Sequence, residues 1–446
     1  MKSEMNARNT FVLLLCLVLS PVATCAQEPE NQTPAGLPTP TPATLNGQKP
    51  MLTFRAEETQ SNFLSGGINL TSAFTDNTFL STADSKSEFS YLIQPYISFS
   101  QTTSRIVWNA NAGVGIIIDQ GLSNEDQVAG NVGVDLTYRY TLHTNLRFSD
   151  TFTDARGLFP QLNSAASTGI GVVEQPNNSL LVPLTQRTRS NMSLVEFSSQ
   201  FSPSDTAGVR GTFSILDYPG SSQNTQFGTL YNTQSYSGEV FYNHQQSLEQ
   251  WVGATLRVQR FDTQPSLATT DAVSLLFYYA AAPHPGVELS IFAGPEYYDN
   301  SVHLPIAIAS GQFQGHQWTP AAGATVAWHG ENTSAEAGFS RQVSDGGGLY
   351  SAVTLEQFNA SVKSQLTERQ AIYFVFTQST NQPIGTGHGY DGLSARFQLE
   401  HLVRKNLILR LAYGRQRQDP PSSMSGVSAN LVWVSLSYNF SRAIGK

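Results

Sequence analysis

The chain has 446 residues, of which 13% are charged, and its formal net charge is −8. Soluble domains usually carry about 25% charged residues, so this composition disfavours a set of ordinary soluble domains. The mild acidity also argues against nucleic acid as a partner, because a nucleic-acid-binding surface is basic. Few charges, 11% aromatic residues and 35 glycines are typical of a membrane β-barrel, in which polar residues dilute the apolar ones.

Residues 1–26 are predicted to be a signal peptide. A basic start is followed by the apolar segment 11–19, which is too short to cross a membrane as a helix. Small residues then lead to an expected cleavage after Ala26. Both cysteines, Cys16 and Cys25, lie in this segment, so the mature chain would have no disulfide. Lipoprotein processing at Cys25 is the minor alternative.

Residues 27–60 are predicted to be a linker. The segment is rich in proline and threonine up to about residue 50 and has few large apolar side chains, so it cannot build a core. We expect an extended periplasmic spacer here. A tether to the cell wall or to a partner is the alternative.

From about residue 63 onwards, apolar and polar residues alternate with a period of two, which predicts β-strands. No stretch after the signal peptide shows a sustained helical period. The clearest apolar rows are Ile68, Leu70 and Phe74; Tyr91, Ile93, Ile97 and Phe99; Ile106, Trp108, Ala110, Ala112, Val114 and Ile116; Val132, Val134, Leu136, Tyr138 and Tyr140; Val252, Ala254, Leu256 and Val258; Val273, Leu275, Phe277 and Tyr279; Val287, Leu289, Ile291 and Ala293; Ile372, Phe374 and Phe376; Ala395, Phe397 and Leu399; and Leu407, Leu409, Leu411 and Tyr413.

The predicted connections alternate in length. Eight short turns fall at 101–104, 141–143, 202–205, 245–248, 282–286, 329–332, 366–369 and 403–406, and nine longer loops at 76–87, 119–125, 154–186, 218–230, 262–269, 299–313, 344–351, 380–388 and 418–426. Seventeen connections predict eighteen strands, within a range of 16–18. An even number is typical of a single-chain bacterial barrel and puts both barrel ends on the short-turn, periplasmic side.

The last predicted strand, 427–440, determines the fold class. Its apolar row runs through Val432, Val434, Leu436, Tyr438 and Phe440. It is longer than the usual strand of about 5–6 residues, and about 9–11 tilted residues cross a bilayer. A strand in lipid must be paired along both edges. The sequence therefore predicts an all-β fold: one transmembrane, antiparallel, up-and-down barrel over 61–440, with a tail at 441–446.

Four segments carry a family resemblance: 89–99, 105–115, 132–152 and 434–440. They resemble outer-membrane β-barrel porins, most of all the barrels found beside exopolysaccharide export systems. The resemblance implies that the C-terminal signature ending at Phe440 hands the chain to the barrel assembly machinery. It departs from the usual pattern because six residues follow Phe440. The resemblance is one of general residue pattern over about 60–440, and it includes no catalytic or ligand-binding motif.

Catalytic and metal-binding motifs are missing from the sequence. None of the eight histidines lies in a His-Glu-x-x-His motif, and no Gly-x-Ser-x-Gly occurs. Gly346–Gly348 after Asp345 lacks the end of a phosphate-binding loop and is interpreted as a flexible loop. We therefore expect no enzyme activity, no metal and no cofactor. A serine and histidine set at the barrel rim is the one enzymatic alternative.

Charged residues out of phase with the apolar rows are predicted to line the lumen. Either they filter solutes, or they pair across strands and stabilise the wall. These residues are Arg139, Arg147, Arg210, Arg257, Arg396, Arg410, Asp135, Glu239, Glu288, Glu356 and Glu400.

The longest loop, 154–186, is unusually apolar for an outer loop. Loops of this length are usually functional or disordered. We predict that it folds into the lumen as a constriction or over the mouth as a lid, and a packed extracellular rim is the alternative. The residues proposed for it are Leu158, Phe159, Ile170, Val172, Leu180 and Leu181.

A barrel of 16–18 strands encloses an aqueous channel. The sequence therefore predicts a bacterial outer-membrane porin for passive diffusion of small or oligomeric polar solutes. Its expected partners are outer-membrane lipid and the barrel assembly machinery, and its oligomeric state stays open. One alternative is a structural component of a secretion or polysaccharide-export assembly, which would add export partners. The other is a rim enzyme acting on lipid.

Overall fold

The computed structural model describes residues 61–80, 85–120, 127–156, 186–219, 224–225, 228–264, 268–302, 315–384, 389–419 and 426–443. The predicted signal peptide and linker lie outside the described residues. The strands are β1 Ser61–Thr75, β2 Glu88–Thr102, β3 Ile106–Asp119, β4 Gln127–Arg139, β5 Thr144–Arg156, β6 Arg187–Gln200, β7 Asp205–Asp217, β8 Asn224–Thr225, β9 Gly228–Thr229, β10 Asn232–Ser247, β11 Gln250–Gln264, β12 Ala268–His284, β13 Val287–Val302, β14 Gly315–His329, β15 Thr333–Gly346, β16 Tyr350–Thr367, β17 Gln370–Pro383, β18 Tyr390–Arg404, β19 Leu407–Asp419 and β20 Val427–Ala443. Among these residues, no helix is long and apolar enough to cross a membrane.

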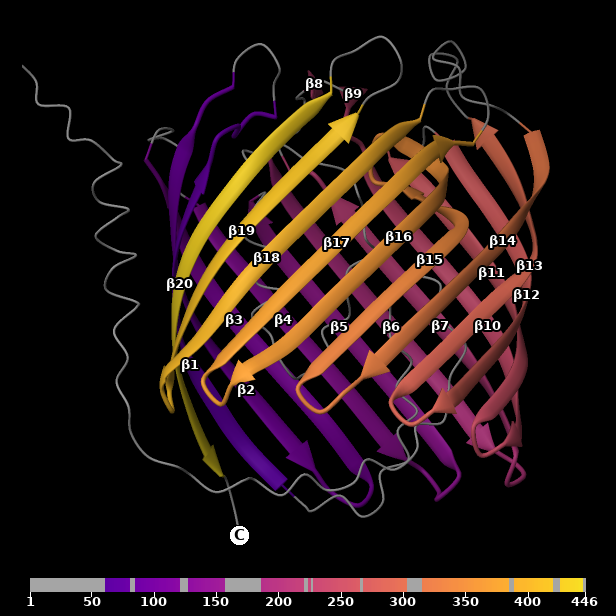
Figure 1. The fold of residues 1–446 in the computed structure, drawn as a ribbon. Coiled ribbons are helices and arrows are strands. Elements are labelled where there is room, and N and C mark those ends of the chain that lie inside the picture. The colour runs from indigo at the N-terminus through magenta and orange to yellow at the C-terminus, as the bar shows by residue number, and fades with distance from the viewer. Residues whose placement is uncertain are drawn as a thin grey trace, which may run out of the picture.

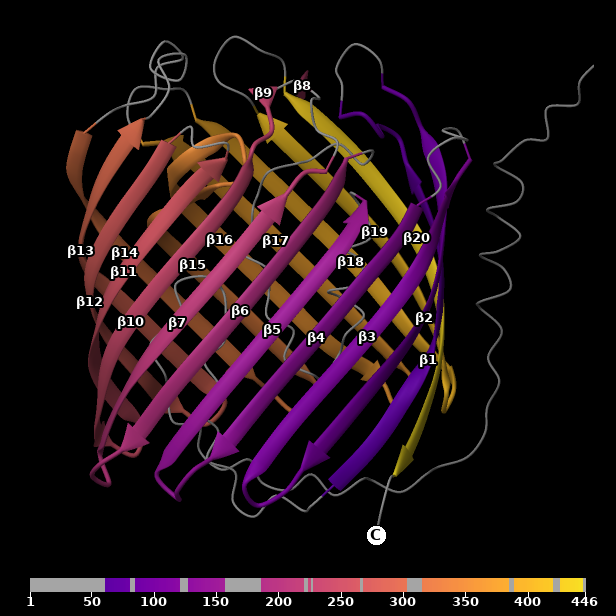
Figure 2. The ribbon, with the colours of Figure 1, turned by 180° about the vertical axis from the view of Figure 1, so that it is seen from behind.

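Eighteen of these strands form one closed antiparallel barrel (Figures 1 and 2). Each strand pairs with its neighbours in sequence, β7 pairs with β10 past the small β8–β9 hairpin, and β1 pairs with β20 to close the ring. The predicted fold class and strand number are confirmed. Closure gives the first and the last barrel strand a partner on both edges, which a wall in lipid requires.

The two faces of the wall differ in polarity because side chains alternate along each strand. Large apolar residues such as Ile97, Val128 and Phe277 are more than half exposed on the outer face. The residues between them point inward and include buried polar groups such as Gln94 and Arg257. An outward apolar band on a closed barrel is the surface that a bilayer covers.

The closing strand is longer than the sequence predicts. β20 pairs with β1 from Leu431 opposite Thr75 to Ala443 opposite Phe63. Residues 441–443 of the predicted tail therefore belong to the wall, because β1 begins early enough to provide partners for them. Phe440 lies opposite Gly66, inside the strand and not at its end.

Two predicted loops are shorter than expected. The predicted loop 262–269 reduces to residues 265–267 between β11 and β12, and 344–351 reduces to 347–349 between β15 and β16. The strands continue beyond their outward apolar rows into polar residues. Because those polar residues show no alternation, the sequence predicts loops there.

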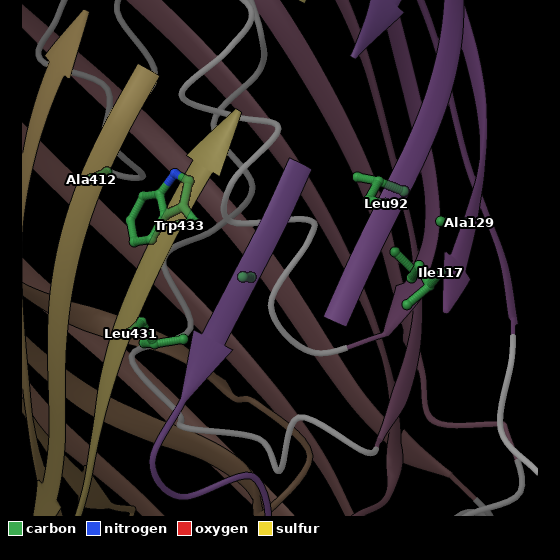
Figure 3. Close-up of a cluster of buried hydrophobic side chains, with 8 residues drawn as sticks. Leu92, Ile117, Ala129, Ala412, Leu431 and Trp433 are labelled. Atoms are coloured by element: carbon green, nitrogen blue, oxygen red, sulfur yellow. The ribbon is translucent and has the colours of Figure 1, made fainter. Parts of the chain in front are cut away.

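A buried apolar cluster lies on the inner wall where the first and the last barrel strands meet (Figure 3). Trp433 and Leu431 of β20 lie at one side of the cluster, and Leu92 of β2 and Ile117 of β3 at the other. These side chains, at most 6% exposed, hold the seam between β20 and β1 on its inner side.

Candidate functional site: a charge-lined and bridged lumen

A ladder of charges with alternating sign crosses the inner wall. In strand register, Arg147 lies opposite Glu196, Glu196 opposite Arg210, Arg210 opposite Glu239, and Glu239 opposite Arg257. We call these five residues, on β5, β6, β7, β10 and β11, the charge ladder. Opposite charges on facing residues of adjacent strands attract, so each charge of the ladder faces a charge of opposite sign.

The centre of the ladder is tightly bonded. Arg210 donates from Nη2 and Nε to one oxygen of Glu196, at 2.6 and 2.8 Å. Its Nη1 donates to Glu239 at 3.2 Å. The side chains of Arg210 and Glu196 are only 7% and 8% exposed. At the end of the ladder, Arg147 binds Asp135 on β4 at 2.7 Å.

Arg257, the last residue of the ladder, connects it to Glu296 two strands further along the wall. It lies opposite Ser274 of β12, which in turn lies opposite Glu296 of β13. Its Nη2 is 3.4 Å from Glu296 Oε1, and the two side chains are 1% and 0% exposed. The other oxygen of Glu296 accepts a hydrogen bond from the backbone N–H of Val343, at 2.9 Å. This bond joins the charged wall to a hairpin inside the barrel.

That hairpin is the end of β15 and the beginning of β16. β15 pairs with β14 only as far as Arg341, and beyond this point it leaves the wall. We call residues 342–352 the inner hairpin, which bends inward near the upper end of the barrel in Figures 1 and 2. Its side chains pack against the walls of β11, β12 and β13, in a cluster of Phe261, Ala272, Tyr298, Val343, Ala352 and Ile384. Gly346–Gly348, predicted to be a flexible loop, forms the buried tip, so that prediction is wrong.

The tip is held by the segment that follows β7. The hydroxyl of Tyr218 donates to the carbonyl of Gly347 at 2.5 Å, and the N–H of Tyr231 donates to the carbonyl of Gly348 at 2.8 Å. Burial raises the pKa of Tyr218, so its hydroxyl keeps the proton that it donates. Gly348 has a φ of +89°, and a Cβ there would lie 2.5 Å from the Tyr218 ring. This position therefore requires glycine.

The contacts of this tip extend across the whole barrel. Tyr218 packs with Leu230 and with Tyr390 at the start of β18, and Leu349 and Tyr350 pack against them. We call these five residues the aromatic bridge. β7 and β18 are diametrically opposed, since β10–β17 separate them on one side and β19, β20 and β1–β6 on the other, eight strands each way. The bridge therefore crosses the mouth of the barrel.

Seven of the predicted lumen residues form ion pairs on the inner face: Arg147, Arg210, Arg257, Arg410, Asp135, Glu239 and Glu400. Arg410 donates to Glu400 at 2.8 Å and to Ser437 at 2.8 Å. These contacts favour the pairing interpretation over free charges.

Three more predicted lumen residues lie on the inner row outside the ladder. Arg396 lies at an inward position of β18, in phase with Glu400. Arg139 lies near the periplasmic end and donates to the carbonyl of Ser104 at 3.3 Å. Glu288 is exposed near the start of β13.

Glu356 was predicted to line the lumen, and this is wrong. It is two residues from the exposed Phe358, hence on the outer face, and it pairs with Arg341 at 2.8 Å. Because β15 and β16 continue beyond the outward apolar rows, a polar outer pair is tolerated here. Sequence reasoning also missed Glu196 and Glu296. Glu196 follows the exposed Val195, so the alternation could have identified it.

Residues 154–156 of the predicted constriction loop 154–186 belong to β5. Residues 157–185 lie outside the described residues, and with them Leu158, Phe159, Ile170, Val172, Leu180 and Leu181. Within the described ranges, no three His, Cys, Asp or Glu side chains gather as a metal site.

The described strands thus define a closed eighteen-stranded antiparallel barrel with a charge-lined and bridged lumen. No protein-family model and no curated protein matches the chain. Among solved structures, Pseudomonas aeruginosa OpdK with vanillate is similar at 11% identity, over 85% of this chain and 99% of that one, with a TM-score of 0.45. Acinetobacter baumannii OccAB4 shows 9% identity over 86% and 98%, with a TM-score of 0.44. Pseudomonas aeruginosa OpdQ shows 9% identity over 85% and 98%, with a TM-score of 0.45. At these identities, the fold assignment rests on the strand pairing of this chain.

Proposed function

We propose that this chain is an outer-membrane channel through which small polar solutes diffuse passively. The observation that carries the proposal is the opposite polarity of the two wall faces. The outer face is apolar, whereas the inner face carries the charge ladder and further buried polar groups. Barrels of this strand number enclose water, so the inner polarity suits a hydrated path. The function requires no cofactor and no catalytic residue.

Selection would occur at two levels of the lumen. The aromatic bridge and the inner hairpin narrow the mouth, so they limit the size of a solute. Below them, the ladder offers donors and acceptors in close pairs. Because its charges face one another in pairs of opposite sign, the ladder favours solutes with both kinds of polar group over simple ions. Small neutral or zwitterionic polar molecules fit this wall best.

Planar-bilayer recording tests the proposal. The purified barrel, shown to be folded by a mobility shift on boiling, should give discrete conductance steps. A folded barrel without such steps would contradict the proposed channel.

A variant of the hairpin tests the constriction separately. Residues 343–354 are replaced by Asn-Gly, which joins the directly paired Gln342 and Leu355 through a two-residue hairpin turn. We expect a larger conductance, because the deletion removes the tip at Gly347 and, with it, Leu349 and Tyr350 of the aromatic bridge. Asn332→Ala, in the turn at the opposite end of β15, is the matched control and should leave the conductance unchanged. Equal conductance of the hairpin variant and the control would exclude the inner hairpin as a constriction.

A narrower function follows from the sequence resemblance alone. The barrel would serve beside an exopolysaccharide export system, with its periplasmic linker at 27–60 facing export partners. Affinity purification from cells that express an export system tests this, with a variant lacking 27–60 as the control. Loss of export proteins from that variant alone would support the docking role.

A further inference from the structure

The outer apolar band is interrupted on β5 and β6. Leu146 and Phe148 of β5, and Phe197 and Val195 of β6, are 40–49% exposed and mark the outward rows. In the next outward positions toward the rim, Asp150 stands on β5 and Ser193 on β6, and Asn191 is the outward residue of β6 beyond Ser193. A charged and two polar side chains therefore take positions that neighbouring strands give to apolar residues.

These outward groups are bonded to one another. Asp150 Oδ1 accepts hydrogen bonds from Ser193 Oγ at 2.6 Å and from Asn191 Nδ2 at 3.2 Å. Nearer the rim, Arg187 binds Asp154 at 2.6 Å, and Arg189 lies 3.4 Å from the same carboxylate. We call these six residues the polar stripe: Asp150, Asp154, Arg187, Arg189, Asn191 and Ser193.

The stripe reaches deep into the band. Four residues at about 3.3 Å each, tilted by about 45°, put Asp150 about 9 Å above Leu146. The apolar band of such barrels is about 25 Å tall, so Asp150 lies well inside it. Its neighbours in register on β4 and across β6 are Val134 and Phe213. Lipid headgroups can reach Arg187 and Arg189 at the rim, but not Asp150.

A bare patch of wall lies beside the stripe. Gly211 of β7 and Gly238 of β10 face each other on the outer side. A Cβ at Gly238 would meet nothing within 4 Å, and one at Gly211 only a carbonyl at 3.9 Å. The packing of this chain therefore does not require glycine at either position. Small residues on a lipid-facing surface allow another protein wall to approach closely.

We propose that the polar stripe is the contact between two copies of this chain, related by a two-fold axis along the membrane normal. Such an axis brings the same patch of each copy to the same depth. The side chains of Asn191 and Ser193 each donate and accept hydrogen bonds, and Asp150 accepts them. Donors of one copy can therefore bond to acceptors of the other. Arg189 and Asp154 give the upper stripe both signs of charge. Pairing removes a carboxylate from lipid, and it does not depend on conduction through the lumen.

Subunit counting in lipid tests the proposal. The fluorescently labelled full chain should bleach in two steps, and the variant Asp150→Leu, Asn191→Leu, Ser193→Ala in one. The variant should keep its mobility shift on boiling, because it replaces outward polar groups with apolar ones. Asn191→Cys should form a crosslinked dimer on oxidation, whereas Ala324→Cys, outward on the distant β14, should not. The unsubstituted chain, which carries Cys16 and Cys25, is the background for crosslinking.

Four outcomes would overturn the proposal. One-step bleaching of the unsubstituted chain would show that the stripe faces lipid. Two steps retained in the triple variant would place the contact elsewhere. Three steps would exclude a two-fold pair. Lipopolysaccharide retained by the unsubstituted monomer, and lost with Arg187→Ala and Arg189→Ala, would identify the upper stripe as a headgroup site instead.

Discussion

Arg257 offers the sharpest test of how the inner wall holds the hairpin. Its guanidinium and the carboxylate of Glu296 are almost completely buried, 3.4 Å apart. Arg257→Met keeps most of the side-chain volume but removes the charge. Glu296 then retains its bond from Val343 and loses its cationic partner. We expect the free energy of unfolding to fall by about 3–5 kcal/mol, the usual effect of leaving a buried charge unpaired.

Two further variants separate the interaction between Arg257 and Glu296 from the other contacts of these side chains. Glu296→Gln keeps an acceptor for Val343, and Arg257 still has Glu239 opposite it, so a loss of about 1–3 kcal/mol is expected. In the double variant neither charge remains unpaired. Its loss should therefore be smaller than the sum of the single losses by at least about 1 kcal/mol, since contacting residues couple.

Urea unfolding of the barrel in lipid vesicles measures these values, with the boiling-dependent mobility shift as the readout. Arg139→Met, at the periplasmic end of the wall, is the matched control and should change the midpoint little. If the two single losses simply add in the double variant, to within about 0.5 kcal/mol, the interaction inferred between Arg257 and Glu296 is refuted.

Three further predictions concern the bridge and the ion pairs. Tyr218→Phe removes the hydrogen bond to Gly347 and should destabilise the inner hairpin by about 1 kcal/mol. Single-channel recordings should then show more frequent transitions to higher conductance, and an unchanged recording would count against the bond. Gly348→Ala should strain the tip by about 1–3 kcal/mol, because φ is +89°, and should raise mean conductance, whereas normal conductance would show that the tip adjusts. Arg210→Met should lower stability by about 3–5 kcal/mol, and Arg341→Met, whose outer pair is about one third exposed, by at most about 1 kcal/mol; equal urea midpoints would contradict the burial argument.

The amino-acid sequence by itself determined the barrel. Alternation with a period of two is a local property, so the order of residues shows where strands run and which side chains share a face. The row ending at Phe440 predicted a membrane strand that needs two partners, and the alternation of connection lengths predicted the count. The same rows identified Arg147, Arg210 and Arg257 as inward.

Only the tertiary structure decided how the lumen is filled. The bond from Tyr218 to Gly347 joins residues 129 positions apart. Tyr350 meets Tyr390, with 6.2 Å between the ring centroids, because the inner hairpin bends away from the wall. The sequence places Glu356 on the wrong face and predicts a flexible loop at Gly346–Gly348, and both errors have the same cause. A strand pattern shows which face a residue occupies, but it does not show where the strand leaves the wall. That depends on contacts across the barrel, which exist only after the ring has closed.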